Sequence, residues 1–145
     1  MPIKNWKKIN TIFTEVPFNK IEYITRPEFI NGQEEFFYKS LKESIKKRGL
    51  LDPLFLTNID GKLKTIVGNN RMVICKKLGI KKIKCIITQI GKKDTFLKGR
   101  VLKTDKEIKD LFHAPEEVTV RRNDKGWVDQ VNTVKFTRII NKYEE

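Results

Sequence analysis

Apolar and polar positions alternate in blocks along the chain, and the blocks predict strands and helices in a mixed order. A short extended segment is predicted over residues 16–26, where apolar positions stand between two prolines. Over residues 33–48 apolar side chains recur every three or four positions, which predicts an amphipathic helix. Gly49 follows as a natural helix stop, because glycine adopts the left-handed conformation that ends many helices without strain.

The middle of the chain predicts a hairpin, a helix and a central strand. Strands over residues 54–57 and 63–67 flank a turn at 58–61 that is rich in Asn, Asp and Gly. A short helix over residues 72–78 is expected to pack through one narrow apolar face. The β-branched run at 83–90 predicts a strand in the centre of a sheet.

The last third of the chain has a weaker pattern. Residues 92–102 are basic and predict an exposed ribbon or loop. Thr104 and Glu107 have the spacing of a capping box, which predicts a short helix after them. A strand is predicted over residues 118–122, followed by a turn. The final stretch, 127–143, has loosely helical spacing that favours a helix, although its β-branched residues leave a strand open.

The charge of the chain is one-sided, with 31 Lys and Arg against 18 Asp and Glu and a formal net charge of +13. A length of 145 residues with 39% hydrophobic and 34% charged positions predicts one globular domain, either alone or with a small appendage. The positive excess favours a polyanionic partner, above all nucleic acid, while a lysine-rich surface that serves solubility is the alternative. Without a secretory signal or a run of about 20 apolar residues, we expect a cytoplasmic protein with no membrane partner.

The cysteines and the single histidine carry little predicted chemistry. Cys75 and Cys85 lack the spacing of a metal or redox pair, so they are interpreted as buried packing residues. His113 stands at the end of the predicted short helix and is interpreted as a C-cap partner rather than a catalyst. No cluster of acids has metal-binding spacing, so no metal site is predicted.

The strongest signal for a binding site is the loop Gly68, Asn69, Asn70 and Arg71, which leads from a predicted strand into a predicted helix. Such a loop points free backbone N–H groups and the positive end of the helix dipole into one small space. The guanidinium of Arg71 adds a planar fork of donors that matches phosphate oxygens. The loop therefore predicts an anion site, with phosphate as the first candidate.

The order of the motifs carries a resemblance to a known fold. A strand, R-P at 26–27, a helix, GLLDPL, a hairpin, VGNNRMVICKKLG and IKCII follow one another in this chain. This order resembles the ParB/sulfiredoxin fold, whose members have a G-L-x-x-P element and a G-x-x-R loop that opens a helix ending in L-G. The resemblance covers about residues 17–90. It implies an α/β fold with a small mixed sheet and helices, as a nucleotide-binding domain over residues 1–91 and a short basic α/β extension over 92–145.

The resemblance also implies a ligand. Members of this fold bind nucleotides: CTP in the chromosome-partitioning ParB proteins, and ATP or ADP in sulfiredoxin and the free-serine kinases. The implied cofactor is therefore CTP, ATP or ADP, with Mg²⁺ left open. By resemblance, the residues that would hold phosphate or line the nucleotide pocket are Arg26, Gly49, Leu50, Pro53, Gly68, Asn69, Asn70 and Arg71.

Asn69 is where the chain departs from its relatives. ParB proteins usually read G-E-R-R in this loop and sulfiredoxin reads G-C-H-R, so an amide stands in place of an acid or a reactive cysteine. An amide binds a phosphate oxygen but cannot act as a general base. Binding is therefore favoured over catalysis, weak NTP hydrolysis stays open, and sulfiredoxin activity is not expected. Glu28 or Asp52 would be the acid available to ligate Mg²⁺ or accept a proton, although loop and turn roles are the simpler interpretation of both.

Basic residues gather after the predicted nucleotide-binding domain. The candidates for contact with nucleic acid are Lys92, Lys93, Lys98, Arg100, Arg121 and Arg122. The favoured function is a ParB-like nucleotide-binding protein that associates with DNA. The alternatives are a DNA-binding or adaptor module of a phage or mobile element with a vestigial pocket, and a small-molecule kinase that uses Glu28. Nothing in the sequence selects the nucleotide, the DNA sequence or the oligomeric state.

Overall fold

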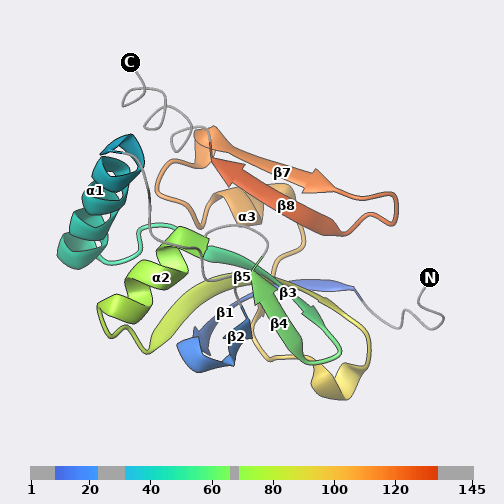
Figure 1. The fold of residues 1–145 in the computed structure, drawn as a ribbon. Helices are drawn as coiled ribbons and strands as arrows, with labels where there is room; N and C mark the ends of the chain where they lie inside the picture. The colour runs from blue at the N-terminus through green and yellow to red at the C-terminus, as the bar shows by residue number, and fades with distance from the viewer. Residues whose placement is uncertain (1–8, 23–31, 66–68, 134–145) are drawn as a thin grey trace.

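The computed structural model describes residues 9–22, 32–65 and 69–133 of the chain. The helices and strands, in chain order, are β1 (Asn10–Pro17), β2 (Ile21–Glu22), α1 (Gly32–Arg48), β3 (Leu54–Ile59), β4 (Lys62–Thr65), α2 (Asn69–Lys77), β5 (Lys82–Ile90), β6 (Arg100–Val101), α3 (Asp105–Lys109), β7 (Val118–Arg122) and β8 (Val128–Thr133). This succession confirms the predicted mixture of helices and strands (Figure 1).

One mixed sheet runs through the middle of the molecule, with the strand order β2-β4-β3-β5-β1-β6. β5 is parallel to β3, with Cys85 opposite Leu54, and antiparallel to β1 on its other side. The prediction of a central strand at this position is therefore confirmed. β3 and β4 form the predicted hairpin, and its turn holds Asp60 at φ 50° and Gly61 at φ 88°. Two consecutive positive φ angles are what a tight hairpin turn requires, and they explain the Asp-Gly pair.

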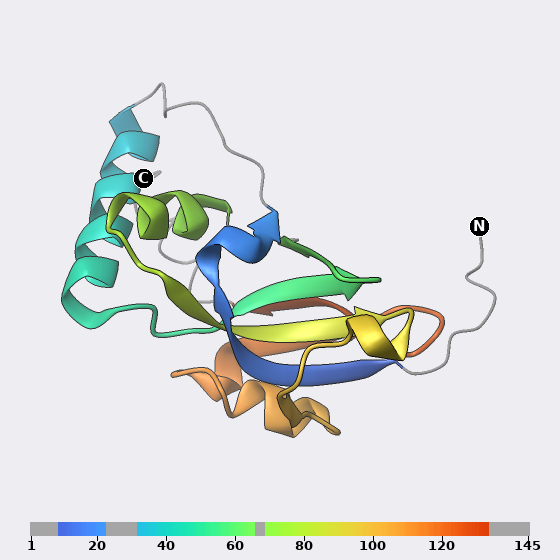
Figure 2. The same ribbon diagram turned by 90° about the horizontal axis from the view of Figure 1, so that it is seen from below.

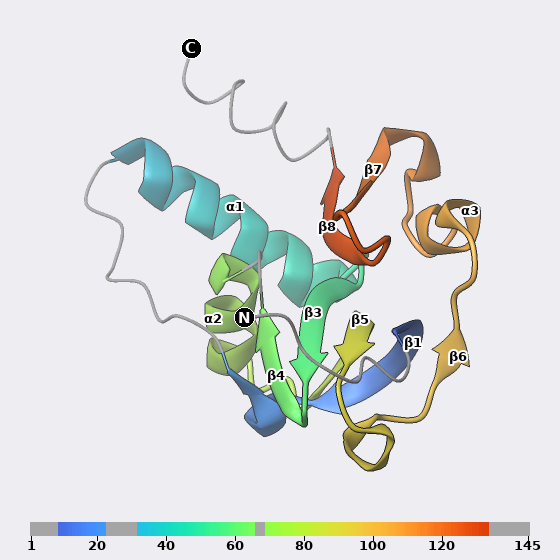
Figure 3. The same ribbon diagram turned by 90° about the vertical axis from the view of Figure 1, so that its right-hand side faces the viewer.

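α2 covers one face of the sheet, and α1 packs against α2 (Figure 3). Met72 and Cys75 of α2 are buried among strand residues such as Leu56 and Ile87. Burial of this apolar face is the main source of stability for so short a helix, because an isolated helix of this length is marginal in water.

The opposite face of the sheet is covered by residues 102–133, which contain α3, β7 and β8 and are called here the C-terminal layer (Figure 2). Phe55 of β3 and Ile86 of β5 share a buried cluster with apolar residues of this layer, among them Val128. A hydrogen bond adds to the contact, because the Thr88 hydroxyl of β5 donates to the Val128 carbonyl over 2.8 Å. Successive side chains of β5 therefore point into two different hydrophobic cores, which explains why the strand is a continuous apolar run.

Two stretches differ from their predictions. β1 begins at Asn10, six residues before the predicted extended segment, because its alternation includes polar threonines that hide the strand pattern. Residues 128–133 form strand β8 and not the favoured helix. The turn before β8 returns the chain against β7, so its β-branched residues pair across a hairpin. Residues 134–143 of the same predicted helix lie outside the described residues.

The helix ends follow the predicted signals. Gly49 after α1 and Gly79 after α2 both adopt φ 73°, which confirms the glycine stop of the longer helix. The Thr104 hydroxyl accepts the Glu107 backbone N–H at 3.2 Å and confirms the predicted cap of α3. None of the helices within the described ranges is long and apolar enough to span a membrane.

A buried polar network links the β3–β4 hairpin to the segment after β5. Asn58 and Gln89 are fully buried, and the Asn58 amide donates to Gln89 Oε1 over 2.9 Å. Gln89 in turn binds both backbone groups of Leu97, accepting its N–H at 2.6 Å and donating to its carbonyl at 3.0 Å. A buried amide whose partners are all satisfied fixes the path of the chain, because any other path leaves polar groups without water or partner.

Gln89→Leu is therefore expected to destabilise the protein by about 2–4 kcal/mol, because both backbone groups of the partly buried Leu97 lose their partner and the buried Asn58 amide loses one of its two acceptors. Chemical denaturation monitored by circular dichroism measures the change. Gln130→Leu on β8, where the glutamine is only partly buried, is the matched control, with an expected change within about 0.5 kcal/mol. Equal effects of the two substitutions would contradict the network's structural role.

Both cysteines are buried and unpaired with each other, as the sequence predicts. Burial raises the pKa of the Cys75 thiol to about 11 against the opposing charge of Arg71, and burial raises that of Cys85 to about 12. At pH 8 no more than about one thiol in a thousand is then the reactive thiolate. Native protein should therefore react with a disulfide reagent at pH 8 at least about a hundredfold more slowly than protein unfolded in guanidinium. Fast labelling of the native protein would contradict this burial.

Candidate functional site

A cavity of about 220 Å³ opens where the C-terminal end of α1, the turn that follows it, the first turn of α2 and the C-terminal layer meet. Its walls therefore come from segments far apart in the chain. The residues that line it are Leu41, Ser44, Ile45, Arg48, Gly49, Leu50, Leu51, Asp52, Arg71, His113 and Thr133.

Three of the predicted pocket residues line this cavity together: Gly49, Leu50 and Arg71. Gly49 ends α1, where its N–H donates to the Ile45 carbonyl over 2.8 Å, and its positive φ turns the chain toward the cavity. Pro53 is buried and is not among the described lining residues. Three other predicted site residues, Arg26, Glu28 and Gly68, lie outside the described residues.

The predicted loop at 68–71 is largely helical. α2 begins at Asn69, so Asn70 and Arg71 belong to its first turn. The predicted helix start at Met72 is therefore three residues late. The change strengthens the anion argument, because a residue in the first turn lies beside the backbone N–H groups that have no partner within the helix.

Arg71 is partly buried on the cavity wall. Burial lowers the pKa of its guanidinium, while the negative charge of Asp52 opposes this shift and Cys75 contributes in the same direction as Asp52. An arginine stays protonated in proteins even so, so the site keeps a positive charge that is only partly hydrated. A partly desolvated guanidinium binds an anion more strongly than an exposed one does.

Asp52 and His113 form a hydrogen-bonded pair on the cavity wall. Oδ1 of Asp52 lies 2.6 Å from Nδ1 of His113 and accepts the His113 backbone N–H at 3.1 Å. The Asp52 side chain is only 11% exposed, and that of His113 is 35% exposed. His113 thus follows α3 by several residues and contacts Asp52, and the C-cap position of α3 is held by Asp110. The interpretation of His113 as a C-cap partner is therefore wrong.

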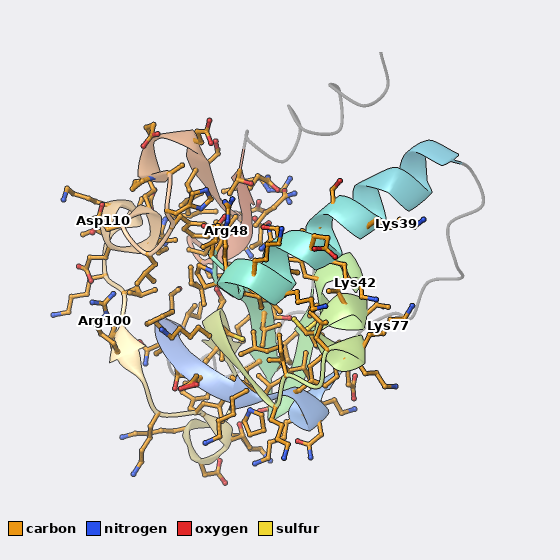
Figure 4. The ribbon with its side chains drawn as sticks, turned by 90° about the vertical axis from the view of Figure 1, so that its left-hand side faces the viewer. Lys39, Lys42, Arg48, Lys77, Arg100 and Asp110 are labelled. Carbon is orange, nitrogen blue, oxygen red and sulfur yellow. The ribbon has the colours of Figure 1, made fainter. Side chains whose placement is uncertain are left out.

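Arg48 is a further cavity residue that the sequence analysis did not single out. It is the last residue of α1 and lies where that helix meets the C-terminal layer (Figure 4). Leu41, Ser44, Ile45 and Arg48 share one stripe of the helix, so the spacing of residues three and four apart could have identified it. No local pattern could have joined Asp52 to His113, because 61 positions separate them.

The predicted nucleic-acid residues occupy two separate places. Four are exposed: Lys92, Lys93 and Lys98 lie on the segment between β5 and β6, and Arg100 is the first residue of β6. The other two lie on β7 and are ion-paired: Arg121 with Asp129 at 3.0 Å, and Arg122 with Asp105 at 2.6 Å. Arg100 also lies 5.8 Å from the centre of the Phe13 ring.

A further group of exposed lysines surrounds the link between α2 and β5: Lys76, Lys81, Lys82 and Lys84. The sequence analysis did not consider them as a nucleic-acid surface, although the run KKLGIKKIK shows them plainly. Across the part of the chain that is described, no three His, Cys, Asp or Glu residues are grouped so as to hold a metal ion.

Comparison with known proteins gives a family match and a set of similar solved structures. Sulfiredoxin from Arabidopsis thaliana is 30% identical with a TM-score of 0.46, over 58% of this chain and 91% of that one. ParB from Caulobacter crescentus, C-terminally truncated and complexed with CTP-γ-S, is 15% identical with a TM-score of 0.42, over 57% of this chain and 47% of that one. A Pnob8-like ParB-N domain is 17% identical with a TM-score of 0.43, over 95% of this chain and 63% of that one.

The chain thus spans about half of the C. crescentus ParB structure and under two thirds of the Pnob8-like domain. A search of curated proteins gives no match. The sequence profile of the ParB N-terminal domain matches residues 4–98, which is well over half of the chain. This range contains β1 to β5, the turn at Gly49 and the first turn of α2. The protein therefore belongs to the ParB N-terminal domain family.

Proposed function

We propose that this protein binds a nucleotide, CTP or ATP, in the cavity between α1, α2 and the C-terminal layer, and that it associates with DNA through its basic surface. The observation that carries the proposal is the partly buried Arg71, placed in the first turn of α2 on the wall of a cavity. A guanidinium fork beside a helix N-terminus suits a phosphate better than any neutral ligand.

The charges around the cavity support an anionic ligand. Arg48 and Arg71 contribute two positive charges, and Asp52 contributes one negative charge that is already hydrogen-bonded to His113. The lining therefore retains a positive excess while the histidine is neutral. Such an excess inside a concavity concentrates anions, because the low-dielectric walls focus the field.

The remaining wall of the cavity suits the sugar or base of a nucleotide. Leu41, Ile45, Leu50 and Leu51 give it an apolar side beside the charged one. Ligand sites typically combine such apolar walls with a few placed polar groups, in volumes of about 300–1,000 Å³. At about 220 Å³ the described cavity has room for part of a nucleotide, with the phosphates on the side of Arg71. CTP is the first ligand to test, since a ParB named above was solved with CTP-γ-S.

Arg71→Ala is expected to weaken nucleotide binding by at least about tenfold, because a charge-assisted hydrogen bond contributes about 1.5–3 kcal/mol. Isothermal titration calorimetry with CTP, ATP and ADP in the presence of Mg²⁺ measures the effect. Lys76→Ala, at an exposed position of the same helix, is the matched control and should leave the Kd unchanged.

Thermal unfolding separates binding from stability in the same variant. The melting temperature of Arg71→Ala should change by no more than a few degrees. The partly buried guanidinium pays a desolvation cost in the folded protein, and this cost offsets the stability that its contacts contribute. A large fall in melting temperature would identify Arg71 as a structural residue instead. Absence of binding by all three nucleotides to the unmodified protein would refute the proposed function.

For DNA we favour the segment between β5 and β6 over the β7–β8 hairpin. Lys92, Lys93 and Lys98 are exposed. Arg121 and Arg122, by contrast, each form an ion pair with a nearby aspartate. Lysines at the surface bind the phosphate backbone without reading bases, so the expected binding is strongly salt-dependent and independent of sequence.

Replacement of Lys92, Lys93 and Lys98 by alanine should weaken binding to a DNA duplex and reduce the slope of log K against log salt by about 2 to 3, one unit per lost phosphate contact. Fluorescence anisotropy at several salt concentrations measures both. The matched control replaces Lys76, Lys81 and Lys84, which removes the same charge elsewhere and should change the slope by less than one. Equal effects of the two triple substitutions would show that the overall charge of the protein, and not the segment between β5 and β6, determines DNA binding. DNA binding with no nucleotide binding would instead favour an adaptor module with a vestigial pocket.

A further inference from the structure

Asp52 is the one acid among the described residues that line the cavity, where Arg48 and Arg71 supply the positive charge. We propose that Asp52 selects the sugar of a bound nucleotide: its Oδ2 accepts a hydrogen bond from a ribose hydroxyl, so nucleotides that keep their ribose hydroxyls bind more tightly than those that lack them. This inference rests on the proposed binding of a nucleotide in this cavity. It adds a residue that discriminates between ligands with the same base and the same phosphates.

The two oxygens of the Asp52 carboxylate have different surroundings. Oδ1 accepts the His113 backbone N–H at 3.1 Å and lies 2.6 Å from Nδ1 of the same residue. These two contacts hold the carboxylate in one orientation. No hydrogen bond joins the second oxygen, Oδ2, to any part of the chain that the structure describes. Because Asp52 lines the cavity and its side chain keeps 11% exposure, Oδ2 can accept a donor from a ligand held there.

The parts of a nucleotide differ in what they offer to a carboxylate. Phosphate oxygens are negatively charged and only accept hydrogen bonds, so Asp52 repels them while Arg48 and Arg71 attract them. Ribose hydroxyls are neutral and donate, and dinucleotide-binding enzymes use a carboxylate as the acceptor for such a hydroxyl. One acid beside two arginines is therefore suited to a ligand that places a hydroxyl group next to its phosphates.

The position of Asp52 favours the sugar over the base. Burial lowers the pKa of the Arg71 guanidinium and the charge of Asp52 opposes this shift, so the two side chains lie within short electrostatic range of each other. In a nucleotide the ribose follows the phosphates directly, whereas the donor groups of the base lie beyond it. A volume of about 220 Å³ has room for only part of a nucleotide. With phosphates at Arg71, the sugar therefore reaches Asp52 and the base lies toward the cavity mouth.

The experiment compares CTP with 2′,3′-dideoxy-CTP, which has the same base and the same phosphates but lacks both ribose hydroxyls. Isothermal titration calorimetry of the full chain with each nucleotide and Mg²⁺ gives two dissociation constants. The unmodified protein should bind the dideoxynucleotide at least about tenfold more weakly, because the hydrogen bond to a charged acceptor is lost. Removal of Mg²⁺ with a chelator should leave the ratio of the two constants unchanged.

Asp52→Ala should bring this ratio to within about threefold of one, because the variant has no acceptor for the hydroxyl. Asp52→Asn keeps the shape of the side chain and an acceptor for His113, and it should give an intermediate ratio, since a neutral amide forms a weaker hydrogen bond than a carboxylate. A change in net charge or in cavity shape affects both nucleotides alike and leaves the ratio in place. Glu116→Ala, which removes an exposed carboxylate of the C-terminal layer, is the matched control and should keep the unmodified ratio.

Melting temperatures confirm that each variant is folded. Equal affinities for CTP and its dideoxy form, or a ratio that persists in Asp52→Ala, would overturn this proposal and leave the proposed function standing. A ratio that vanishes with Mg²⁺ would identify Asp52 as a metal ligand instead. If Asp52→Ala changed the preference for CTP over UTP but not the preference for the intact sugar, the carboxylate would face the base and the assignment would be wrong. Absence of binding by every nucleotide would refute both this proposal and the proposed function.

Discussion

The burial of β5 on both of its faces is the constraint on which the rest of the structure depends. Neighbouring residues of this strand point in opposite directions, so Ile87 enters the core under α2 and Ile86 enters the core under the C-terminal layer. Neither α2 nor the C-terminal layer can bury its own apolar residues without the sheet. The central strand therefore needs both layers, and both layers need the strand, which makes residues far beyond the family-matched region part of the same folded unit.

This double burial also builds the cavity. β3 pairs with β5, and its first residue, Leu54, lies opposite Cys85. This pairing fixes the position of the turn from Gly49 to Pro53, which leads directly into β3. On the other face, the apolar cluster and the bond from Thr88 to Val128 hold the C-terminal layer against the sheet. The layer is thereby positioned so that His113 reaches Asp52. The candidate site therefore depends on packing on both faces of the sheet. A substitution in either hydrophobic core should alter the positions of the cavity residues.

Short-range patterns predicted most elements of this fold, because helical spacing, β-branched runs and glycine stops act within a few residues. They failed where pairing across the chain decides the outcome: β8 has loosely helical spacing but forms a strand against β7. The same distinction holds for the site. The order of the motifs correctly placed Gly49 and Arg71 in one predicted pocket. Arg48 could have been identified from the helical spacing of the cavity residues on α1. The contact between Asp52 and His113 depends on the packing of the C-terminal layer, which no local pattern specifies.

The most direct test of a nucleotide site in this cavity is a nuclear magnetic resonance titration of the ¹⁵N-labelled full chain with CTP and, separately, ATP. A ligand held between α1, α2 and the C-terminal layer should shift the amide resonances of Gly49, Leu50, Arg71 and His113 together, with one common dissociation constant. The amide resonances of edge strand β6, such as that of Val101, should not shift, because this strand does not line the cavity. Shifts confined to the exposed lysines, or no shifts at millimolar nucleotide, would contradict the assignment of this cavity as the binding site.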